Sequence, residues 1–418
     1  MNKPVSLLCA AMMIPTPFLV ASPILIDTVP VRYAGNSPDF TTGFGAVAYP
    51  YRIARYEVTV SQYVDFLNAV ADFDTHGLYS TSMTTVPQVA GVDRSGVPGN
   101  YVYSVRGDAA RPITFVSWFD AARFANWMSN GQPSGAQDNT TTEDGAYTLV
   151  PPFDHVGFTK NTINPNTRRP PLWWIPSEDE WYKAAYHNPG RNAGLGGYHF
   201  YPVQSALDSI PYSAQTTGAG APDPLFTANF LRDDAIANGY NDGYAVTGSP
   251  VFPATNALSW VGAYSAPTFH GTYDQGGNVA EITDGTIDVG GTLRRVSRGG
   301  SWMDSELPMR ATVRLDTNPT VETMGIGFRL ATAEPAAQRI RFATPRRSQL
   351  RVGKRFRLSV SSDSGLSVTV RSSAPAVLSV SGPFARVRRS GRVVLTASQA
   401  GDSLALPATP VEKRLTVR

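Results

Sequence analysis

The stretch Ser297-Arg-Gly-Gly-Ser-Trp-Met-Asp304, with the shorter run Gly325-Ile-Gly-Phe-Arg-Leu330, decides the fold of this 418-residue chain. The glycine pairs Gly276-Gly277 and Gly299-Gly300 are not phosphate-binding loops, because no strand, GxxxxGK sequence and following helix surround them. The two runs indicate a particular fold only when they are considered together with segments that precede them in the chain.

Three upstream segments carry the signals of helix starts. Each begins with a Thr or Ser, whose side chain can cap the first free N–H groups of a helix. Apolar residues then recur every three or four positions, as on the buried face of a helix. These patterns predict helices over 59–70, 117–128 and 177–188, the last ended by Pro189. Long stretches without periodicity separate them, over 74–108, 129–170 and 192–225.

Five segments occur in the order found in one known family. They are Tyr56-Glu-Val-Thr-Val-Ser-Gln-Tyr63, the ranges 112–122 and 174–185, Tyr273-Asp-Gln-Gly-Gly-Asn-Val-Ala-Glu281, and the single stretch that contains the two runs quoted first. Together they resemble the formylglycine-generating enzyme, or sulfatase-modifying factor, family over residues 45–333. The resemblance implies an α+β fold similar to that of C-type lectins, with little regular secondary structure.

The resemblance also implies two structural calcium ions, held by oxygen ligands. For one ion it implies the side chains of Asn229 and Asp242 with the carbonyls of Phe230 and Tyr244. For the other it implies the carboxylates of Asp274 and Glu281 with the carbonyls of Gly277 and Val279. The alternative is that these Asp-, Asn- and Gly-rich segments are ordinary turns.

The family's reaction centre is altered in this chain. Family oxidases hold copper(I) between two thiolates, but here Asp304 stands at the first cysteine position and Met309 falls near the second. Ser301 matches the family's serine, so Ser301 and Asp304 are the family-equivalent positions of the catalytic residues. A carboxylate and a thioether form a poor copper(I) pair. We therefore expect no copper and no formylglycine generation, as in a pseudoenzyme.

Other residues offer no second catalytic pattern. The five histidines show no metal-ligand spacing and are interpreted as surface or hydrogen-bonded residues; they are His76, His155, His187, His199 and His270. Arg298, Arg314 and Arg329 are interpreted as braces between loops, with a role in a pocket left open.

The N-terminus predicts export. Lys3 precedes an apolar stretch from Val5 to Ile14, and small residues follow near Ala21, which is typical of a signal peptide over residues 1–22. The alternative is a buried N-terminal segment. The only cysteine, Cys9, lies in this stretch. A periplasmic, cell-surface or secreted protein without a transmembrane segment is expected.

The C-terminal region differs in charge from the rest. Residues 339–418 contain 16 Lys and Arg against 3 Asp and Glu, whereas residues 1–338 contain 20 against 30. Alternating apolar and polar residues predict strands over 355–361, 366–371 and 392–397. The region 340–418 resembles bacterial immunoglobulin-like repeats, which implies a small all-β sandwich. Its basic surface serves either solubility alone or the binding of an acidic polysaccharide or another envelope polyanion.

Three functions remain open at the level of sequence. The first is a calcium-stabilised binding protein for an unidentified protein, peptide or glycan ligand, with no nucleic-acid partner. The second is a cysteine-independent oxidoreductase or a protein- or peptide-modifying enzyme of the same family. The third is a structural component of the cell envelope.

Overall fold

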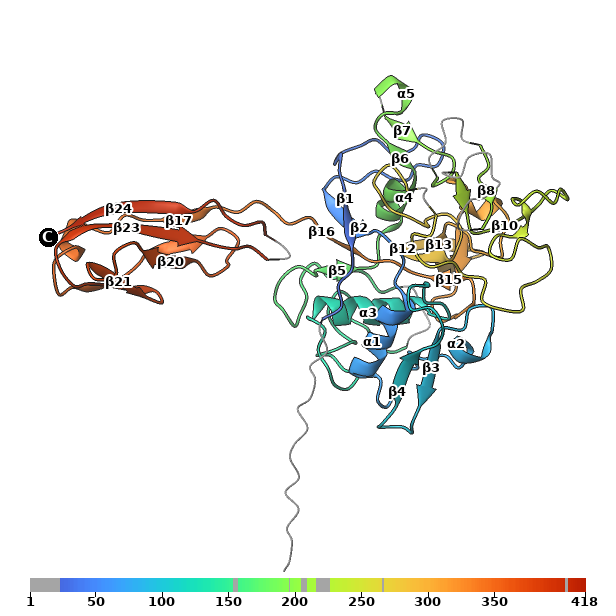
Figure 1. Ribbon diagram of the computed structural model, residues 1–418, viewed down its shortest axis with the longest axis horizontal. Helices are drawn as coiled ribbons and strands as arrows, with labels where there is room; N and C mark the ends of the chain where they lie inside the picture. The colour runs from blue at the N-terminus through green and yellow to red at the C-terminus, as the bar shows by residue number, and fades with distance from the viewer. Residues whose placement is uncertain are drawn as a thin grey trace, which may run out of the picture.

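The computed structural model describes residues 23–152, 157–194, 196–203, 209–215, 226–264, 267–402 and 405–418. The expected signal peptide and His155 lie outside the described residues. A large body is followed by a narrow C-terminal arm made of strands (Figure 1). In the part of the chain that is described, no helix has the length and apolar character needed to span a membrane.

Three helices begin at the predicted caps. They are α1 (Val60–Val70), α3 (Trp118–Ser129) and α4 (Glu178–Tyr186). In each, the preceding Thr59, Ser117 or Ser177 accepts the N–H of the third helical residue, whose own side chain accepts the cap's N–H in return. The sequence prediction of these helices is confirmed, with α4 ending two residues earlier than expected.

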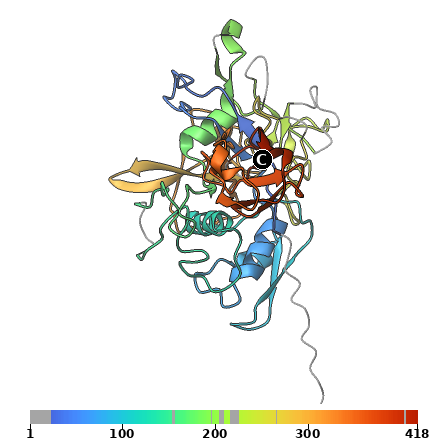
Figure 2. The same cartoon turned by 90° about the vertical axis from the view of Figure 1, so that its left-hand side faces the viewer.

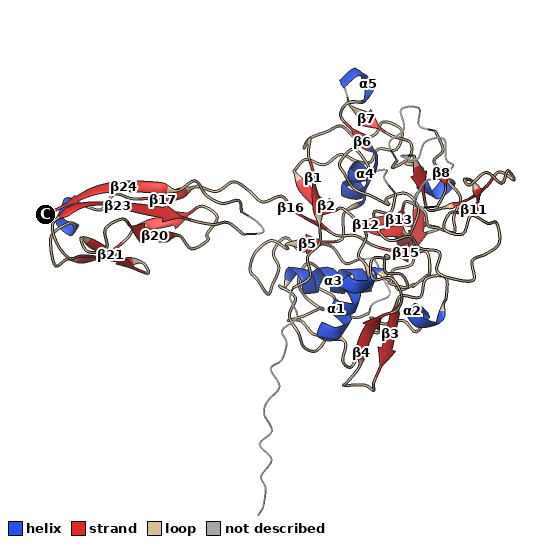
Figure 3. Cartoon of the chain, viewed as in Figure 1, coloured by secondary structure: helices blue, strands red, loops and turns tan. Residues whose placement is uncertain are grey.

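The body contains short elements where the sequence suggested long loops. The stretch 74–108 contains α2 (Ser82–Thr85) and the hairpin of β3 (Val92–Ser95) with β4 (Val102–Val105). The expectation of a loop was wrong there, because strands of four residues are too short to show a clear alternation. Most of the remaining chain consists of ordered loops (Figure 3).

Two four-stranded sheets form the centre of the body. The first has the order β1-β2-β16-β5, and the second the order β14-β13-β12-β15. Their strands are β1 (Thr28–Val31), β2 (Tyr51–Ala54), β5 (Trp173–Trp174), β12 (Ala280–Val289), β13 (Thr292–Arg298), β14 (Leu315–Thr317), β15 (Ile326–Gly327) and β16 (Ala331–Ala333). The hairpin of β12 and β13 protrudes from the body (Figure 2).

The second sheet brings the two fold-deciding runs together. The first run leaves the end of β13 at Arg298, and the second run supplies β15, which pairs in parallel with the start of β12. The helices α1 and α3 pack through aromatic side chains, with the ring centroids of Phe66 and Phe124 5.2 Å apart, and Phe124 also lies 5.5 Å from Phe328 of the second run. This aromatic contact belongs to the main core.

The remaining elements of the body are very short. They are α5 (Arg191–Gly194), the 3-10 helix η1 (Leu307–Met309), and the paired strands β6 (His187–Asn188) with β7 (Gly197–Tyr198), β8 (Tyr212–Ser213) with β9 (Thr227–Ala228), and β10 (Leu231–Asp233) with β11 (Asp242–Tyr244).

The arm is an all-β region with a hydrophobic core of its own. Its sheets are β17-β19, β18-β22-β21 and β20-β23-β24. The strands are β17 (Ile340–Phe342), β18 (Arg355–Arg357), β19 (Val360–Ser362), β20 (Thr369–Ser372), β21 (Leu378–Ser381), β22 (Phe384–Val387), β23 (Gly391–Ser398) and β24 (Val411–Val417), with the 3-10 helix η2 (Arg347–Gln349). The strand predicted over 355–361 is divided into two strands in different sheets. The resemblance to immunoglobulin-like repeats stays a prediction.

Candidate functional site

Three backbone segments meet at the turn that follows β13. Gly277 donates its N–H to the carbonyl of Gly299 at 3.0 Å, and Trp302 donates to the carbonyl of Asn278 at 2.9 Å. Gly277 has φ +81°, and a Cβ on it would lie 2.3 Å from the carbonyl oxygen of Asn229. Only glycine permits this approach, so Gly277 serves close backbone packing.

The three arginines of this region hold carboxylates. Arg298 donates from Nε to Glu178 Oε1 at 2.8 Å, and Arg314 donates from Nε and Nη2 to the same carboxylate at 2.7 and 2.6 Å. Arg329 donates to both oxygens of Glu281 at 2.5 and 2.6 Å. The interpretation of these arginines as braces is confirmed. They join α4 to the loop after β13 and join β12 to the segment after β15.

The residues at the expected family-equivalent catalytic positions form hydrogen bonds with each other. Ser301 donates to Asp304 Oδ2 from its hydroxyl at 2.6 Å and from its N–H at 2.9 Å. The carbonyl of Asp304 accepts the N–H of Leu231 at 2.9 Å. Met309 is fully buried in an apolar cluster with Tyr201. Asp304 and Met309, the residues expected near the family's thiolate positions, thus each make structural contacts in this protein.

The first predicted calcium set lies around the hairpin of β10 and β11. The register of this hairpin places Phe230 and Tyr244 at the same end. The carbonyl of Phe230 accepts the hydroxyl of Ser213 at 2.6 Å, and the Asp242 carboxylate accepts two loop N–H groups. Asn229 uses its amide N–H₂ as a donor, which leaves its oxygen as the available ligand. The oxygens retain lone pairs, so the donor chemistry fits calcium.

The second predicted set is only partly available to a cation. Besides the two bonds from Arg329, the Glu281 carboxylate accepts the indole N–H of Trp181 at 2.8 Å, and its side chain is fully buried. Gly277 stands in the tight turn before β12, and Val279 is buried beside it. A calcium ion here would share Glu281 with a guanidinium.

A third carboxylate, Glu57, lies close to this set. The Glu57 side chain is 2% exposed; Oε1 accepts a bond from Asn278 Nδ2 at 3.0 Å, whereas Oε2 has no hydrogen-bond partner. Burial and the neighbouring Asp274 and Glu281 carboxylates raise the pKa of Glu57 well above its usual range. Burial raises the pKa of Asp274 to about 6. The raised pKa favours the protonated, uncharged form of Glu57, so a divalent cation bound beside it would have to displace that proton.

A pocket of about 660 Å³ opens elsewhere, between the segment 33–41 and the segment 187–200. Its aromatic walls include Tyr33, Phe40 and Phe200, which are 54%, 96% and 37% exposed. Polar groups stand among these rings; Asn36 Nδ2 donates to the Tyr198 hydroxyl at 2.7 Å. Exposed rings beside amide and hydroxyl groups suit a ligand with both apolar and polar faces.

His187 lines this pocket, and the buried basic groups of His270 and Lys183 lie close to the pocket residues His187 and Tyr33. His187 contacts His270 through ring nitrogens 3.3 Å apart, and Lys183 Nζ donates to the Tyr33 carbonyl at 2.9 Å. Burial lowers the pKa of His187 to about 4, of His270 to about 3 and of Lys183 to about 8. At neutral pH the lysine thus carries the charge of this group. In the described ranges, no carboxylate forms an ion pair with Lys183, and no three His, Cys, Asp or Glu side chains gather to hold a metal ion.

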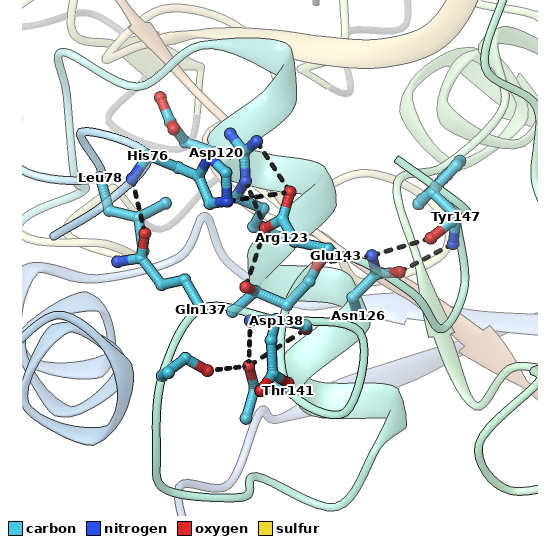
Figure 4. Close-up of polar contacts among 12 residues, drawn as sticks. His76, Leu78, Asp120, Arg123, Asn126, Gln137, Asp138, Thr141, Glu143 and Tyr147 are labelled. Atoms are coloured by element: carbon cyan, nitrogen blue, oxygen red, sulfur yellow. Dashed lines mark hydrogen bonds and ion pairs between the residues drawn. The ribbon is translucent and has the colours of Figure 1, made fainter. Parts of the chain in front are cut away.

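Hydrogen bonds and ion pairs hold the loop after α3 in place (Figure 4). Arg123 donates to both oxygens of Glu143 at 2.8 and 3.0 Å, and His76 Nε2 lies 3.5 Å from the same carboxylate. Asn126 accepts the N–H of Tyr147 at 2.7 Å and donates to its carbonyl at 2.9 Å. His76 is therefore a bonded histidine, in agreement with the interpretation from sequence.

A family model described as the sulfatase-modifying factor enzyme 1-like domain matches residues 45–334. The chain belongs to this family. Residues 45–334 include both fold-deciding runs, the Ser301 and Asp304 positions and all residues of the two predicted calcium sets.

Other similar proteins agree in part with this assignment. The mouse protein "Inactive C-alpha-formylglycine-generating enzyme 2" is 35% identical over 164 residues, which are 38% of this chain and 42% of the mouse protein. The match thus spans less than half the length of that relative. Among solved structures, CarF is 23% identical over 74% of this chain and 99% of its own, with a TM-score of 0.41. PvdO from Pseudomonas aeruginosa is 19% identical over 74% and 91%, with a TM-score of 0.35. TM-scores this low do not define the fold of this sulfatase-modifying factor protein.

Sequence reasoning missed two features of this family member. Glu57 lies in a quoted segment, but its burial beside Asp274 depends on contacts between residues more than 200 positions apart. The pocket joins segments about 150 residues apart, and its rings show no periodicity. The one available signal was the density of aromatic residues near glycines in the segments 33–45 and 194–201.

Proposed function

We propose that this sulfatase-modifying factor protein is an exported, calcium-stabilised binding protein that does not carry out the family's oxidase reaction. The closed pair of Ser301 and Asp304 carries this proposal, because the serine and the carboxylate satisfy each other by hydrogen bonds. Residues 23–418 contain no cysteine, so copper(I) has no thiolate pair in that part of the chain. The name of the inactive mouse relative is consistent with loss of the reaction in this family.

The pocket between the segments 33–41 and 187–200 supports binding as the function. Its exposed aromatic rings lose unfavourable contact with water when a ligand covers them. The neighbouring Asn36 and Tyr198 offer polar atoms for orientation. Glycans and peptides combine apolar and hydrogen-bonding surfaces, and we assign the ligand to these classes.

Calcium is part of the same proposal. The oxygen types around Asn229 and Asp274 are those that calcium prefers, and the unpartnered Glu57 Oε2 offers a further oxygen beside the second set. The role of calcium here is to hold loops together, with no part in a reaction.

Screening purified residues 23–418 on glycan and peptide arrays tests the binding function. The variant Phe40→Ser removes a ring that is 96% exposed, and Leu25→Ser is a matched control, because Leu25 is 87% exposed and does not line the pocket. We expect the wild-type protein and the control to retain the same array features. Phe40→Ser should bind them about two- to tenfold more weakly, since an aromatic contact contributes about 0.5–1.5 kcal/mol.

The absence of any retained glycan or peptide, or equal binding by Phe40→Ser, would contradict a binding function at this pocket. If incubation of the wild-type protein with array peptides changed their mass, the alternative of a cysteine-independent modifying enzyme would replace it.

A further inference from the structure

One face of the arm carries four arginines, which we call the arginine face: Arg355, Arg357, Arg386 and Arg388. Along β18, and along β22 with the residue that follows it, they alternate with the buried residues Phe356, Ala385 and Val387. Because successive side chains of a strand point to opposite sides, the four exposed guanidinium groups share the outer side of the sheet β18-β22-β21.

The arginines of this face lie close together. Arg355 is the direct cross-strand partner of Arg386. Directly opposite residues have Cβ atoms about 5 Å apart, and alternate residues along a strand lie about 7 Å apart. Like charges that face each other across two strands destabilise a sheet. The arrangement therefore costs stability within the chain.

The acidic residues of the arm do not compensate this charge. The three acids of residues 339–418 are Asp363, Asp402 and Glu412. Asp363 accepts the N–H of Arg339, Asp402 pairs with Arg169 of the body at 2.8 Å, and Glu412 lies 3.9 Å from Arg414 on β24. In the described part of the arm, no ion pair involves the arginine face.

The other three-stranded sheet of the arm is mixed in charge. On its outer side, Arg371 of β20 lies opposite Thr396 of β23, and Thr396 lies opposite Glu412 of β24. Arg392 of β23 and Arg414 of β24 are also exposed, so this second sheet is basic as well, but it includes Glu412. The arginine face differs from it in having no acidic residue.

We propose that the arginine face binds an acidic polysaccharide. Guanidinium groups form paired hydrogen bonds with carboxylate and sulfate groups, and a sugar chain presents such groups in a row. Phe384 stands on the same face, 37% exposed and 4.2 Å from the Arg355 guanidinium, where its ring can pack against a sugar. This surface is separate from the pocket, so the inference goes beyond the proposed ligand-binding function.

An anionic lipid membrane and a nucleic-acid duplex fit the arginine face less well than a polysaccharide does. Phe384 is the large apolar side chain exposed on this face, and a single ring gives little apolar area for insertion into a membrane. Residues 1–338 carry a net charge of −10, which repels a thick, densely charged duplex. A thin single polysaccharide chain can contact the arm alone.

The test compares two variants of residues 23–418 that lose the same charge. One carries R355Q, R357Q, R386Q and R388Q; the control carries R371Q, R392Q, R414Q and R418Q, which are exposed elsewhere on the arm. Binding to heparin and to polygalacturonate is measured between 50 and about 200 mM salt, where each lost charge contact reduces the salt dependence by about one counterion. Should the quadruple variant fail to fold, the single variant R386Q replaces it.

We expect the face variant to lose at least tenfold in affinity for both polysaccharides and the control to lose much less. For the face variant, the slope of log affinity against log salt should also fall by about four, one for each guanidinium group removed. An equal loss in both variants would overturn the proposal, as would equal or tighter wild-type binding to duplex DNA or to vesicles of anionic lipid. Variant R386Q should lose affinity in the same direction, and unchanged binding by it would also contradict the proposal.

Discussion

At the scale of single residues, the structure depends on positions where only one residue type fits. Gly277 combines a positive φ with a Cβ position 2.3 Å from the Asn229 carbonyl oxygen. Sequence could identify this glycine as part of a family segment. It could not show the partner carbonyl, because that partner is almost fifty residues upstream and no local pattern encodes the contact.

We predict that Gly277→Ala destabilises the protein more than Gly43→Ala. Both glycines have positive φ, but a Cβ at Gly43 meets nothing within 4 Å. The control should cost about 1 kcal/mol for the backbone conformation, and Gly277→Ala should cost several kcal/mol because the turn must also move. Urea unfolding of both variants measures the difference. Equal losses would show that the close approach to Asn229 is not a constraint.

A second prediction concerns the buried Lys183. Its folded-state pKa of about 8 lies below the ordinary 10.5, so the unfolded chain binds more protons between these values. The cost of burying the charged lysine is therefore full below pH 8 and is lost as the pH rises towards 10.5. Lys183→Met should gain stability relative to wild type at pH 7, and that gain should shrink at pH 10.

Thermal melts at both pH values give this comparison, and the exposed Lys354→Met serves as its control. A difference between Lys183→Met and wild type that does not change with pH would exclude a depressed lysine pKa.

At the scale of elements, side-chain caps made the helices predictable, whereas contacts between distant segments determined the shortest strands. Thr59, Ser117 and Ser177 act locally, so their sequence positions sufficed. Strands of two residues, such as β5 and β15, exist because a neighbouring strand pairs with them, and two residues carry no periodicity. The pocket could not be predicted from the sequence for the same reason, because its walls include the loops around β6 and β7, which carry no periodic pattern.

The start of α4 offers a prediction at this scale. Glu178 is 6% exposed and holds both Arg298 and Arg314, so Glu178→Gln leaves the fully buried Arg298 without its charge partner. We expect a loss of about 3–5 kcal/mol. Glu412→Gln, which disrupts an exposed pair in the arm, should lose no more than about 1 kcal/mol.

Denaturant titration gives the free energy of unfolding of each variant and so measures both expected losses. A Glu178→Gln variant as stable as Glu412→Gln would mean that the arginine braces do not stabilise the helix start.

At the scale of the whole molecule, a family scaffold is joined to a basic arm. The family match over residues 45–334 was accessible from sequence, because it rests on residue identities, and the altered reaction centre stays a prediction from the same identities. The cluster of buried carboxylates around Asp274 could not be predicted from the sequence, since it arises from burial of Glu57 against segments far along the chain. On this account the scaffold keeps its proposed calcium sites and has lost the means to hold copper.

The metal content of purified residues 23–418 tests this account most directly. Elemental analysis by mass spectrometry, after dialysis against metal-free buffer, gives calcium, copper and iron per chain in one experiment. The account predicts about two calcium ions, the number implied by the two oxygen-ligand sets, and no stoichiometric copper or iron. A chain that retains one copper or iron ion and no calcium would contradict it.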